Sequence, residues 1–265
     1  MASLVSKALI LARDRQDVRA RVQNKFDSWM DRFSSPCNPN DVTDAAKIEV
    51  AVAALLSISN PLEAGPRLIA IEKHIEALRV QKANGPFPAE GFHNGSVTLG
   101  TLCYLACRYL RPRVVVETGV AYGVTSTYIL AALEDNNYGE LCSIDLPPLA
   151  FNAAADVGYF VPQELRLRWK LNLGPAKTLL PQLLERTKPI DLFVHDSLHT
   201  YSHMKWEFDV ALSALRPGGL VISDDIDGNR AFEQMVEGDN IDSKLAMRQS
   251  RKNALCGAAR TKLTN

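Results

Sequence analysis

The chain has 265 residues, 46% of them hydrophobic and 23% charged, which suits one large globular domain or two small ones. Its 30 basic residues balance 30 acidic ones, and this formal net charge of zero gives no sign of a nucleic-acid or anionic-membrane partner. No apolar run approaches the ~20 residues that cross a bilayer, and the N-terminal apolar stretch, interrupted by Lys7, is a poor signal peptide.

The first part of the chain reads as helical. Helical spacing of apolar residues predicts helices over about 4–33, 43–58, 66–82 and 97–110, with no strand pattern between them. Residues 84–95 are rich in proline and glycine and are expected to form a loop. We therefore expect residues 1–95 to form a helical extension to a domain that covers residues 96–265.

Beyond Arg113, short apolar runs alternate with helical stretches. This alternation is typical of a parallel sheet with helices on both faces. The predicted fold class is α/β, a Rossmann-like, doubly wound, mostly parallel seven-stranded sheet that ends in an antiparallel hairpin. The expected strands cover 113–118, 140–145, 165–170, 190–195, 219–223, 244–249 and 254–260. The expected helices cover about 124–135, 148–157, 175–186, 202–215 and 229–237.

Residues 114–123, Val-Val-Val-Glu-Thr-Gly-Val-Ala-Tyr-Gly, are the most informative stretch. A buried strand leads into a turn between Gly119 and Gly123, where glycine permits positive φ and close approach of a ligand. The spacing E-x-G-x-x-x-G differs from the G-x-G-x-x-G of dinucleotide sites. The carboxylate of Glu117 would repel a phosphate but suits a cation.

Acids also follow the later strands, at the edge where ligands bind in such sheets. Asp145 ends the second strand, where a carboxylate can accept the hydroxyls of a ribose, although it could also be a solvated turn acid before Pro147. Asp196, Asp224 and Asp225 follow two strands that we expect to be neighbours. Converging carboxylates favour a hard cation such as Mg²⁺.

Two other interpretations of the residues at this edge of the sheet stay open. A zinc site would use His195, His199 and His203, and a metal-free arrangement would leave the acids capping helices and turns. His199, three residues past Asp196, would lie over the same edge of the sheet. An imidazole there can take a proton from a substrate hydroxyl, or it can be a helix-start histidine without a chemical role.

The five cysteines are scattered, odd in number and without a C-x-x-C pair. Cys103 and Cys107 lie four residues apart in a helical pattern and are expected to be small buried hydrophobic residues. A reducing, cytoplasmic location is the natural expectation.

Together, these motifs resemble the class I S-adenosylmethionine-dependent methyltransferases over about residues 96–260. The run VVVETGVAYG is similar to the first motif of that family, and LRPGGLVISDD is similar to its strand-five segment. The resemblance implies an S-adenosylmethionine site with Asp145 on the ribose. The turn Leu173–Ala176 lacks the acid that many members place near adenine, so backbone and apolar contacts are expected there. The implied cofactor-binding residues are Glu117, Thr118, Gly119, Tyr122, Gly123, Ser126, Asp145 and Asp196.

The segment D-S-L-H-T-Y, followed by L-R-P-G-G and an acidic pair, is similar to a narrower group, the metal-dependent sugar O-methyltransferases. This resemblance implies that Asp196, Asp224 and Asp225 hold Mg²⁺, that Asp196 belongs to the catalytic site, and that His199 is the general base. It also implies that the N-terminal helices cover the substrate pocket or build a dimer interface.

The expected function is therefore Mg²⁺-dependent O-methylation of a small hydroxylated molecule such as a sugar or glycosylated natural product. The alternatives are a metal-independent N- or O-methyltransferase and a non-catalytic cofactor-binding subunit. A nicotinamide oxidoreductase is disfavoured by the glycine spacing.

Overall fold

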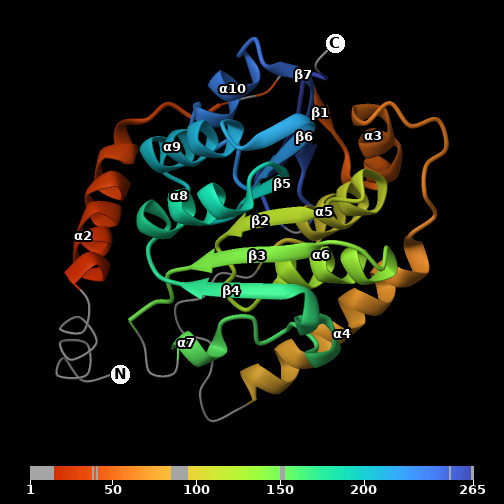
Figure 1. Cartoon of the computed structure of the whole chain (residues 1–265), viewed down its shortest axis with the longest axis horizontal. Helices are drawn as coiled ribbons and strands as arrows, with labels where there is room; N and C mark the ends of the chain where they lie inside the picture. The colour runs from red at the N-terminus through yellow and green to blue at the C-terminus, as the bar shows by residue number, and fades with distance from the viewer. Residues whose placement is uncertain are drawn as a thin grey trace.

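The computed structural model describes residues 15–37, 39, 41–84, 95–149, 153–250 and 252–263. Its strands form a single sheet (Figure 1). In chain order, the strands are β1 (Val42–Thr43), β2 (Val114–Thr118), β3 (Glu140–Asp145), β4 (Trp169–Leu173), β5 (Ile190–His195), β6 (Leu215–Ser223), β7 (Ile241–Arg248) and β8 (Leu255–Thr261).

Within the described residues, the eight strands lie in the order β1-β7-β8-β6-β5-β2-β3-β4. Strand β8 is antiparallel to β6 and β7, and the other neighbouring pairs are parallel. From β2 the chain proceeds outward through β3 to β4, then crosses back to place β5 on the other side of β2. Strand order therefore reverses between β2 and β5, where such sheets bind their ligands.

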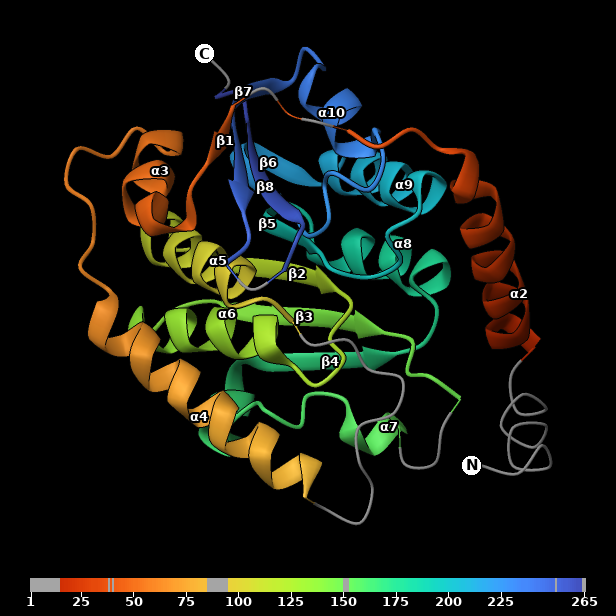
Figure 2. The same ribbon diagram turned by 180° about the vertical axis from the view of Figure 1, so that it is seen from behind.

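Helices cover both faces of the sheet (Figure 2). Helices α3 to α6 pack on one face and α8 to α10 on the other. The helices are α2 (Arg15–Met30), α3 (Ile48–Leu55), α4 (Gly65–Ala83), α5 (Val97–Leu110), α6 (Val124–Asp135), α7 (Ala153–Asp156), α8 (Ala176–Thr187), α9 (Tyr201–Leu212) and α10 (Ala231–Val236). Three 3-10 turns are η1 (Asp31–Phe33), η2 (Ala45–Lys47) and η3 (Gln163–Arg168).

The central strands are buried on both faces, which explains their continuous apolar sequence. In β2, Val115 packs with the layer of α5 and α6, whereas Val114 and Val116 pack with α8 and α9. Leu192 and Phe193 in β5 divide between the two faces in the same way. Two hydrophobic cores therefore hold the ends of β2 and β5 in fixed positions.

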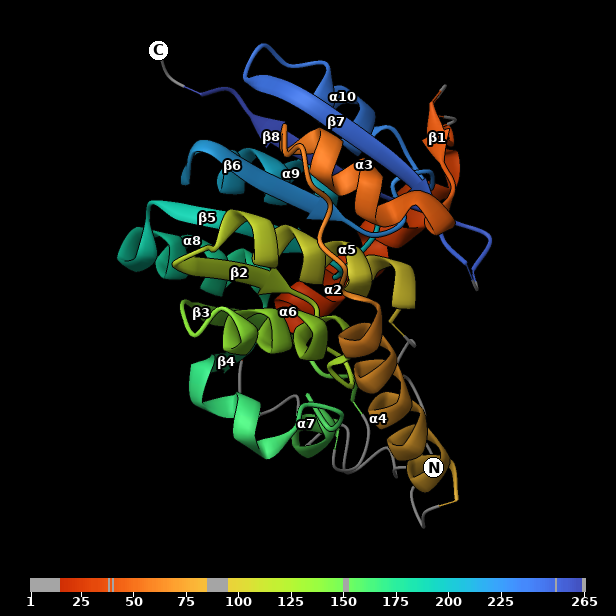
Figure 3. The same ribbon diagram turned by 90° about the vertical axis from the view of Figure 1, so that its right-hand side faces the viewer.

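Among the N-terminal helices, α3 and α4 pack on one face of the sheet, whereas α2 does not (Figures 1 and 2). Figure 3 shows α3 beside β7 and α5, and α4 beside α6, on one face of the sheet. Helix α2 stands apart at the edge toward which the arrowheads of β3 and β4 point (Figures 1 and 2). Within the described residues, no helix has the length and apolar character to cross a membrane. All five cysteines are buried and unpaired, Cys103 and Cys107 among them.

The predicted fold class is confirmed, with one strand more than expected. Strand β1 has only two residues and pairs with β7 at the sheet edge, which is too short to show as an alternating pattern. The expected strand 165–170 lies instead at Trp169–Leu173, where it pairs with β3, and residues 163–168 form η3. Arg166 stabilises that turn by donating to the carbonyl oxygens of Val161 and Gly158.

Several predicted helices have different bounds in the structure. The expected helix 43–58 is divided into the end of β1, the turn η2 and the helix α3. Within the expected helix 148–157, the described helical part is only Ala153–Asp156, and residues 150–152 lie outside the described residues. Gly158 follows with a φ of 71°, in the left-handed region that is common where helices end. The expected helix 4–33 is described only from residue 15, and most of the expected loop 84–95 lies outside the described residues.

Candidate active site

A cavity of about 1160 Å³ opens at the carboxyl ends of β2, β3, β5 and β6. Its volume exceeds the ~300–1,000 Å³ of an ordinary small-molecule pocket, so a cofactor and a second reactant can share it. The lining comes from the glycine turn, the residues after β3 and β5, helix α2 and the acidic pair after β6.

The glycine turn touches the loop that follows β5. Gly119 has a φ of 84°, and a Cβ placed there would lie 1.9 Å from the backbone oxygen of Asp196. The amide of Asp196 also donates to the carbonyl of Thr118 at 2.9 Å. At Gly123, also at a φ of 84°, a Cβ would lie 2.9 Å from the Cα of Gly158. Both glycines are thus required by the protein's own backbone contacts, whatever ligand binds.

Some of the expected cofactor residues line the cavity and others lie beneath it. Gly119, Tyr122, Asp145 and Asp196 line it. Thr118 is buried below the turn, where its hydroxyl donates to Glu207 Oε2 at 2.6 Å. Gly123 forms the N-cap of α6 and is not part of the lining.

Glu117 is fully buried under the turn, not in the cavity wall. Its Oε2 accepts hydrogen bonds from the hydroxyls of Ser126 and Ser143, each at 2.7 Å. Burial raises the pKa of this carboxyl from 4.5 to about 7, although the two hydroxyls act in the opposite direction. The structure therefore shows Glu117 and Ser126 fixing the turn to β3.

Asp145 lines the cavity and binds the backbone of the glycine turn. Its Oδ1 accepts hydrogen bonds from the amides of Val120 at 2.8 Å and Ala121 at 3.2 Å, and among the described residues nothing donates to Oδ2. Burial raises the pKa of this carboxyl, partly offset by the two amides and by the charge of Arg21. Arg21, on α2, donates to the carbonyl of Pro147 at 2.8 Å, so α2 forms the outer wall beside Asp145.

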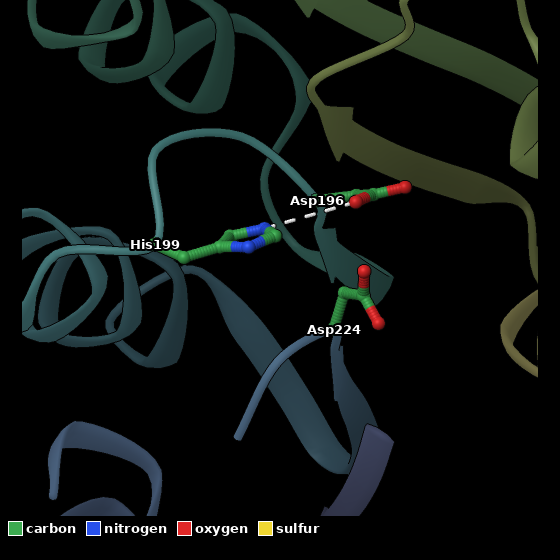
Figure 4. A group of neighbouring side chains, drawn as sticks. All are labelled: Asp196, His199 and Asp224. Carbon is green, nitrogen blue, oxygen red and sulfur yellow. Dashed lines mark ion pairs between the residues drawn. The ribbon is translucent and has the colours of Figure 1, made fainter. Parts of the chain in front are cut away.

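The reaction rim is formed by Asp196, which directly follows β5, His199 in the loop before α9, and Asp224, which directly follows β6 (Figure 4). One ligand atom from each lies within 4.8 Å of the others, and His199 Nε2 is 3.7 Å from Asp196 Oδ1. Thr125 donates to Asp196 Oδ2 at 3.2 Å. The pKa of Asp196 is raised, first by burial and then by the neighbouring carboxylates of Asp224 and Glu117.

Asp225 lies beside this group rather than in it. Its Oδ2 is 2.7 Å from His199 Nδ1. Burial raises the pKa of Asp225, but His199 and Lys252 outweigh burial and bring the pKa down to about 2. Because an ionised carboxylate only accepts hydrogen bonds, Nδ1 of His199 carries the proton. The other nitrogen, Nε2, is buried without a hydrogen-bond partner among the described residues and is on the side of Asp196.

Two residues of the turn between β7 and β8 complete the rim. Lys252 Nζ lies 2.5 Å from Asp225 Oδ1 and 3.0 Å from Asp224 Oδ2. Gln249 donates to Asp224 Oδ1 at 2.6 Å. Burial lowers the pKa of the Lys252 amine, but the two carboxylates outweigh burial and the net shift is upward. Lys252 therefore contributes a positive charge to the acidic rim.

A buried carboxylate on α9 supports the loop that carries Asp196 and His199. Glu207 accepts hydrogen bonds from His195 at 2.6 Å, His203 at 3.0 Å and Ser197 at 3.2 Å, as well as from Thr118. Burial acts to raise its pKa, but the two histidines outweigh burial and lower it. His195 and His203 thus converge on Glu207, and within the described residues they are not part of the group that could hold a metal.

Residues 116–226 match the family model described as a methyltransferase domain. This span contains the glycine turn, Asp145, Asp196, His199 and both acids after β6. Residues 116–226 are therefore similar to a methyltransferase domain. A comparison with curated proteins gives no match.

Solved structures of methyltransferases share the fold of this chain. An O-methyltransferase from Bacillus cereus, in complex with SAH, is 17% identical over 82% of this chain and 100% of that chain, with a TM-score of 0.55. The O-methyltransferase TomG from Streptomyces achromogenes, in complex with SAM, is 21% identical over 82% of this chain and 96% of that chain, with a TM-score of 0.56. An SAH-bound methyltransferase from Podospora anserina is 15% identical over 88% of this chain and 100% of that chain, with a TM-score of 0.52.

Several residues of the candidate site are not among the residues predicted from the sequence. Lys252 and Gln249 lie in the β7–β8 turn, and Arg21 lies on α2, far from the motifs in sequence. A hairpin whose last strand returns antiparallel to β6 must place its turn at the carboxyl edge, and this topological signal points to Lys252. Glu207 has a signal too, because it is a charged residue on the apolar face of α9, four residues after His203.

Proposed function

We propose that this chain is a class I S-adenosylmethionine-dependent methyltransferase that transfers a methyl group to a hydroxyl oxygen of a small molecule, most simply a sugar or glycosylated natural product, with the help of Mg²⁺. The observation that supports this proposal most is the arrangement of Asp225, His199 and Asp196 at the cavity wall. It presents an oriented imidazole nitrogen, Nε2, beside an acidic rim in the same cavity as Asp145.

The residues that line the inner end of the cavity fit S-adenosylmethionine. Asp145 Oδ2 is available for ribose hydroxyls, and the turn from Gly119 to Tyr122 provides backbone next to it. Pro175 and Ala176 line the cavity and support the expectation that adenine binds by backbone and apolar contacts. When bound, this sulfonium cofactor supplies the methyl group.

The acidic rim fits a divalent cation. Asp196 and Asp224 offer carboxylate oxygens, which a hard cation such as Mg²⁺ prefers, with water or acceptor oxygens as further ligands. Asp225 is a weaker candidate than the sequence suggests, because it is not in the group of described residues whose ligand atoms lie within 4.8 Å of one another. When bound, such a cation would lower the pKa of the acceptor hydroxyl.

The residues of the chain then have separate roles. His199 Nε2 takes the proton of the acceptor hydroxyl, while Asp225 holds Nδ1–H and fixes the ring. Asp145 and the glycine turn hold the methyl donor so that both reactants meet in one cavity. Helix α2 covers the outer side of this cavity and contributes to the choice of acceptor.

The proposal is tested by methyl transfer from labelled S-adenosylmethionine to a panel of sugars, glycosides and other hydroxylated acceptors. His199→Ala should lower the rate ~10²–10⁴-fold while S-adenosylhomocysteine still binds. Asp196→Asn should abolish the response to added Mg²⁺. An unchanged rate in His199→Ala would contradict the assignment of the base.

A second candidate is methylation without a metal, which the ammonium of Lys252 between Asp224 and Asp225 favours. A chelator separates the two. Mg²⁺-dependent transfer stops in the chelator and returns with added Mg²⁺. Full activity in the chelator would instead support the metal-independent reaction.

A further inference from the structure

The acidic rim already holds a cation that belongs to the chain. The ammonium of Lys252 bridges the carboxylates of Asp224 and Asp225, at 3.0 Å and 2.5 Å. It lines the same cavity as Asp196 and His199. A positive charge therefore occupies the space between two of the carboxylates that the family resemblance assigns to Mg²⁺.

Both oxygens of Asp224 are engaged from the β7–β8 turn. Gln249 donates to Oδ1 and Lys252 donates to Oδ2. Asp224 itself is almost fully buried, with a side chain that is 4% exposed, so it has no room to turn toward solvent for a new partner. A divalent cation bound at Oδ2 of Asp224 would lie beside the ammonium of Lys252, so the two positive charges compete for this carboxylate.

Lys252 is the donor that can leave. Gln249 is buried, and its backbone amide is held by the carbonyl of Ala254 at 3.1 Å. The amide of Ser250 is held by the hydroxyl of Thr98 at 3.0 Å, which fixes the turn to α5. The side chain of Lys252 is 41% exposed and ends a flexible four-carbon stem, so its ammonium can move into water while the turn stays in place.

We propose that Lys252 is a resident counter-ion that competes with a divalent cation for Asp224. The inference rests on the proposed Mg²⁺ site of the methyltransferase. With the ammonium in place, the rim is partly neutralised without a metal, and the metal binds only as the side chain of Lys252 withdraws. The chain thus sets the affinity of its own metal site through a residue outside the strand-end motifs.

The test measures metal binding directly, without cofactor or acceptor. The full chain is titrated with Mn²⁺, the free ion is followed by electron paramagnetic resonance, and Mg²⁺ is added as a competitor. Lys252→Met, which keeps the stem and removes the charge, should bind Mn²⁺ about five- to tenfold more tightly than the unaltered chain. Lys252→Arg, which keeps the charge, should stay near the unaltered affinity.

The matched control is Lys205→Met, which breaks only the exposed ion pair with Asp209 on α9 and should leave Mn²⁺ affinity unchanged. Equal or weaker binding by Lys252→Met would overturn the competition while leaving the metal site intact. If no variant binds Mn²⁺, both the competition and the metal part of the proposed function fail. Circular dichroism and thermal unfolding confirm that each variant is folded before the comparison is made.

Discussion

Asp224 and Asp225 are neighbours in sequence, yet their carboxylates have different partners. Asp225 lies in the left-handed backbone region, with a φ of 47°, which is uncommon for a residue with a side chain. This conformation places its carboxylate against His199, while Asp224 faces the group with Asp196. Such strain is often found at functional sites, and the sequence alone does not show it.

The first prediction concerns Asp225→Asn. An amide cannot hold Nδ1–H of His199 as firmly as a carboxylate and also permits the other tautomer, so the methyl-transfer rate should fall about 10²-fold or more. The same substitution in a His199→Ala background should cost little further, because the two residues act as one unit. Additive losses in the double variant would show that Asp225 acts independently of His199.

The second prediction concerns the pH dependence of stability at Glu117. The pKa of its carboxyl is raised to about 7 in the folded chain, mainly by burial, so the folded state holds this proton more tightly than the unfolded state. Stability therefore falls as pH rises from about 4.5 to 7, by ~3 kcal/mol in total. In Glu117→Gln this loss should disappear.

Urea unfolding at pH 4.5, 6 and 8 measures the effect. The difference in free energy of unfolding between Glu117→Gln and the unaltered chain should grow with pH over that range. Glu140→Gln, at the partly exposed start of β3, is a control for the removal of a carboxylate from the same strand. A parallel pH dependence in the unaltered chain and Glu117→Gln would contradict the role of Glu117.

At the scale of the element, α9 supports the loop that carries Asp196 and His199 through one buried side chain, Glu207. Glu207 accepts from four donors, and a glutamine oxygen has only two lone pairs to offer them. Glu207→Gln should therefore lower the free energy of unfolding by roughly 3 kcal/mol. The control Asp209→Asn, on the exposed face of the same helix, should change it by ~0.5 kcal/mol or less. Equal losses in the free energy of unfolding from the two substitutions would contradict the supporting role of Glu207.

Elements with strong local patterns could be predicted from the sequence. Helix α5 has the expected bounds 97–110, and β2, β3 and β5 lie within a residue of the expected strands. Strand β4 begins later than the predicted strand 165–170, because its position depends on pairing with β3, which no local sequence pattern shows. Strand β1 was missed for the same reason, since its pairing with β7 defines it.

At the scale of the whole molecule, the candidate site could be predicted wherever it lies at strand ends. Parallel strands bring Asp145, Asp196 and Asp224 to one edge, and the sequence order of the strands indicates that edge. The contributions of α2 and of Lys252 depend on long-range packing, so the motifs did not reveal them. The homo-oligomer through the N-terminal helices stays a prediction, and α2 exposes the apolar side chains of Val22, Phe26, Trp29 and Met30.

The most direct test of the methyltransferase assignment is a calorimetric titration of the full chain with S-adenosylhomocysteine and, separately, with NAD. We predict one bound S-adenosylhomocysteine per chain, no binding of NAD, and a Kd at least about tenfold higher in Asp145→Asn, which keeps the size of the side chain but lacks its charge. Binding of NAD in place of S-adenosylhomocysteine, or equal affinity in Asp145→Asn, would contradict the assignment of this cavity.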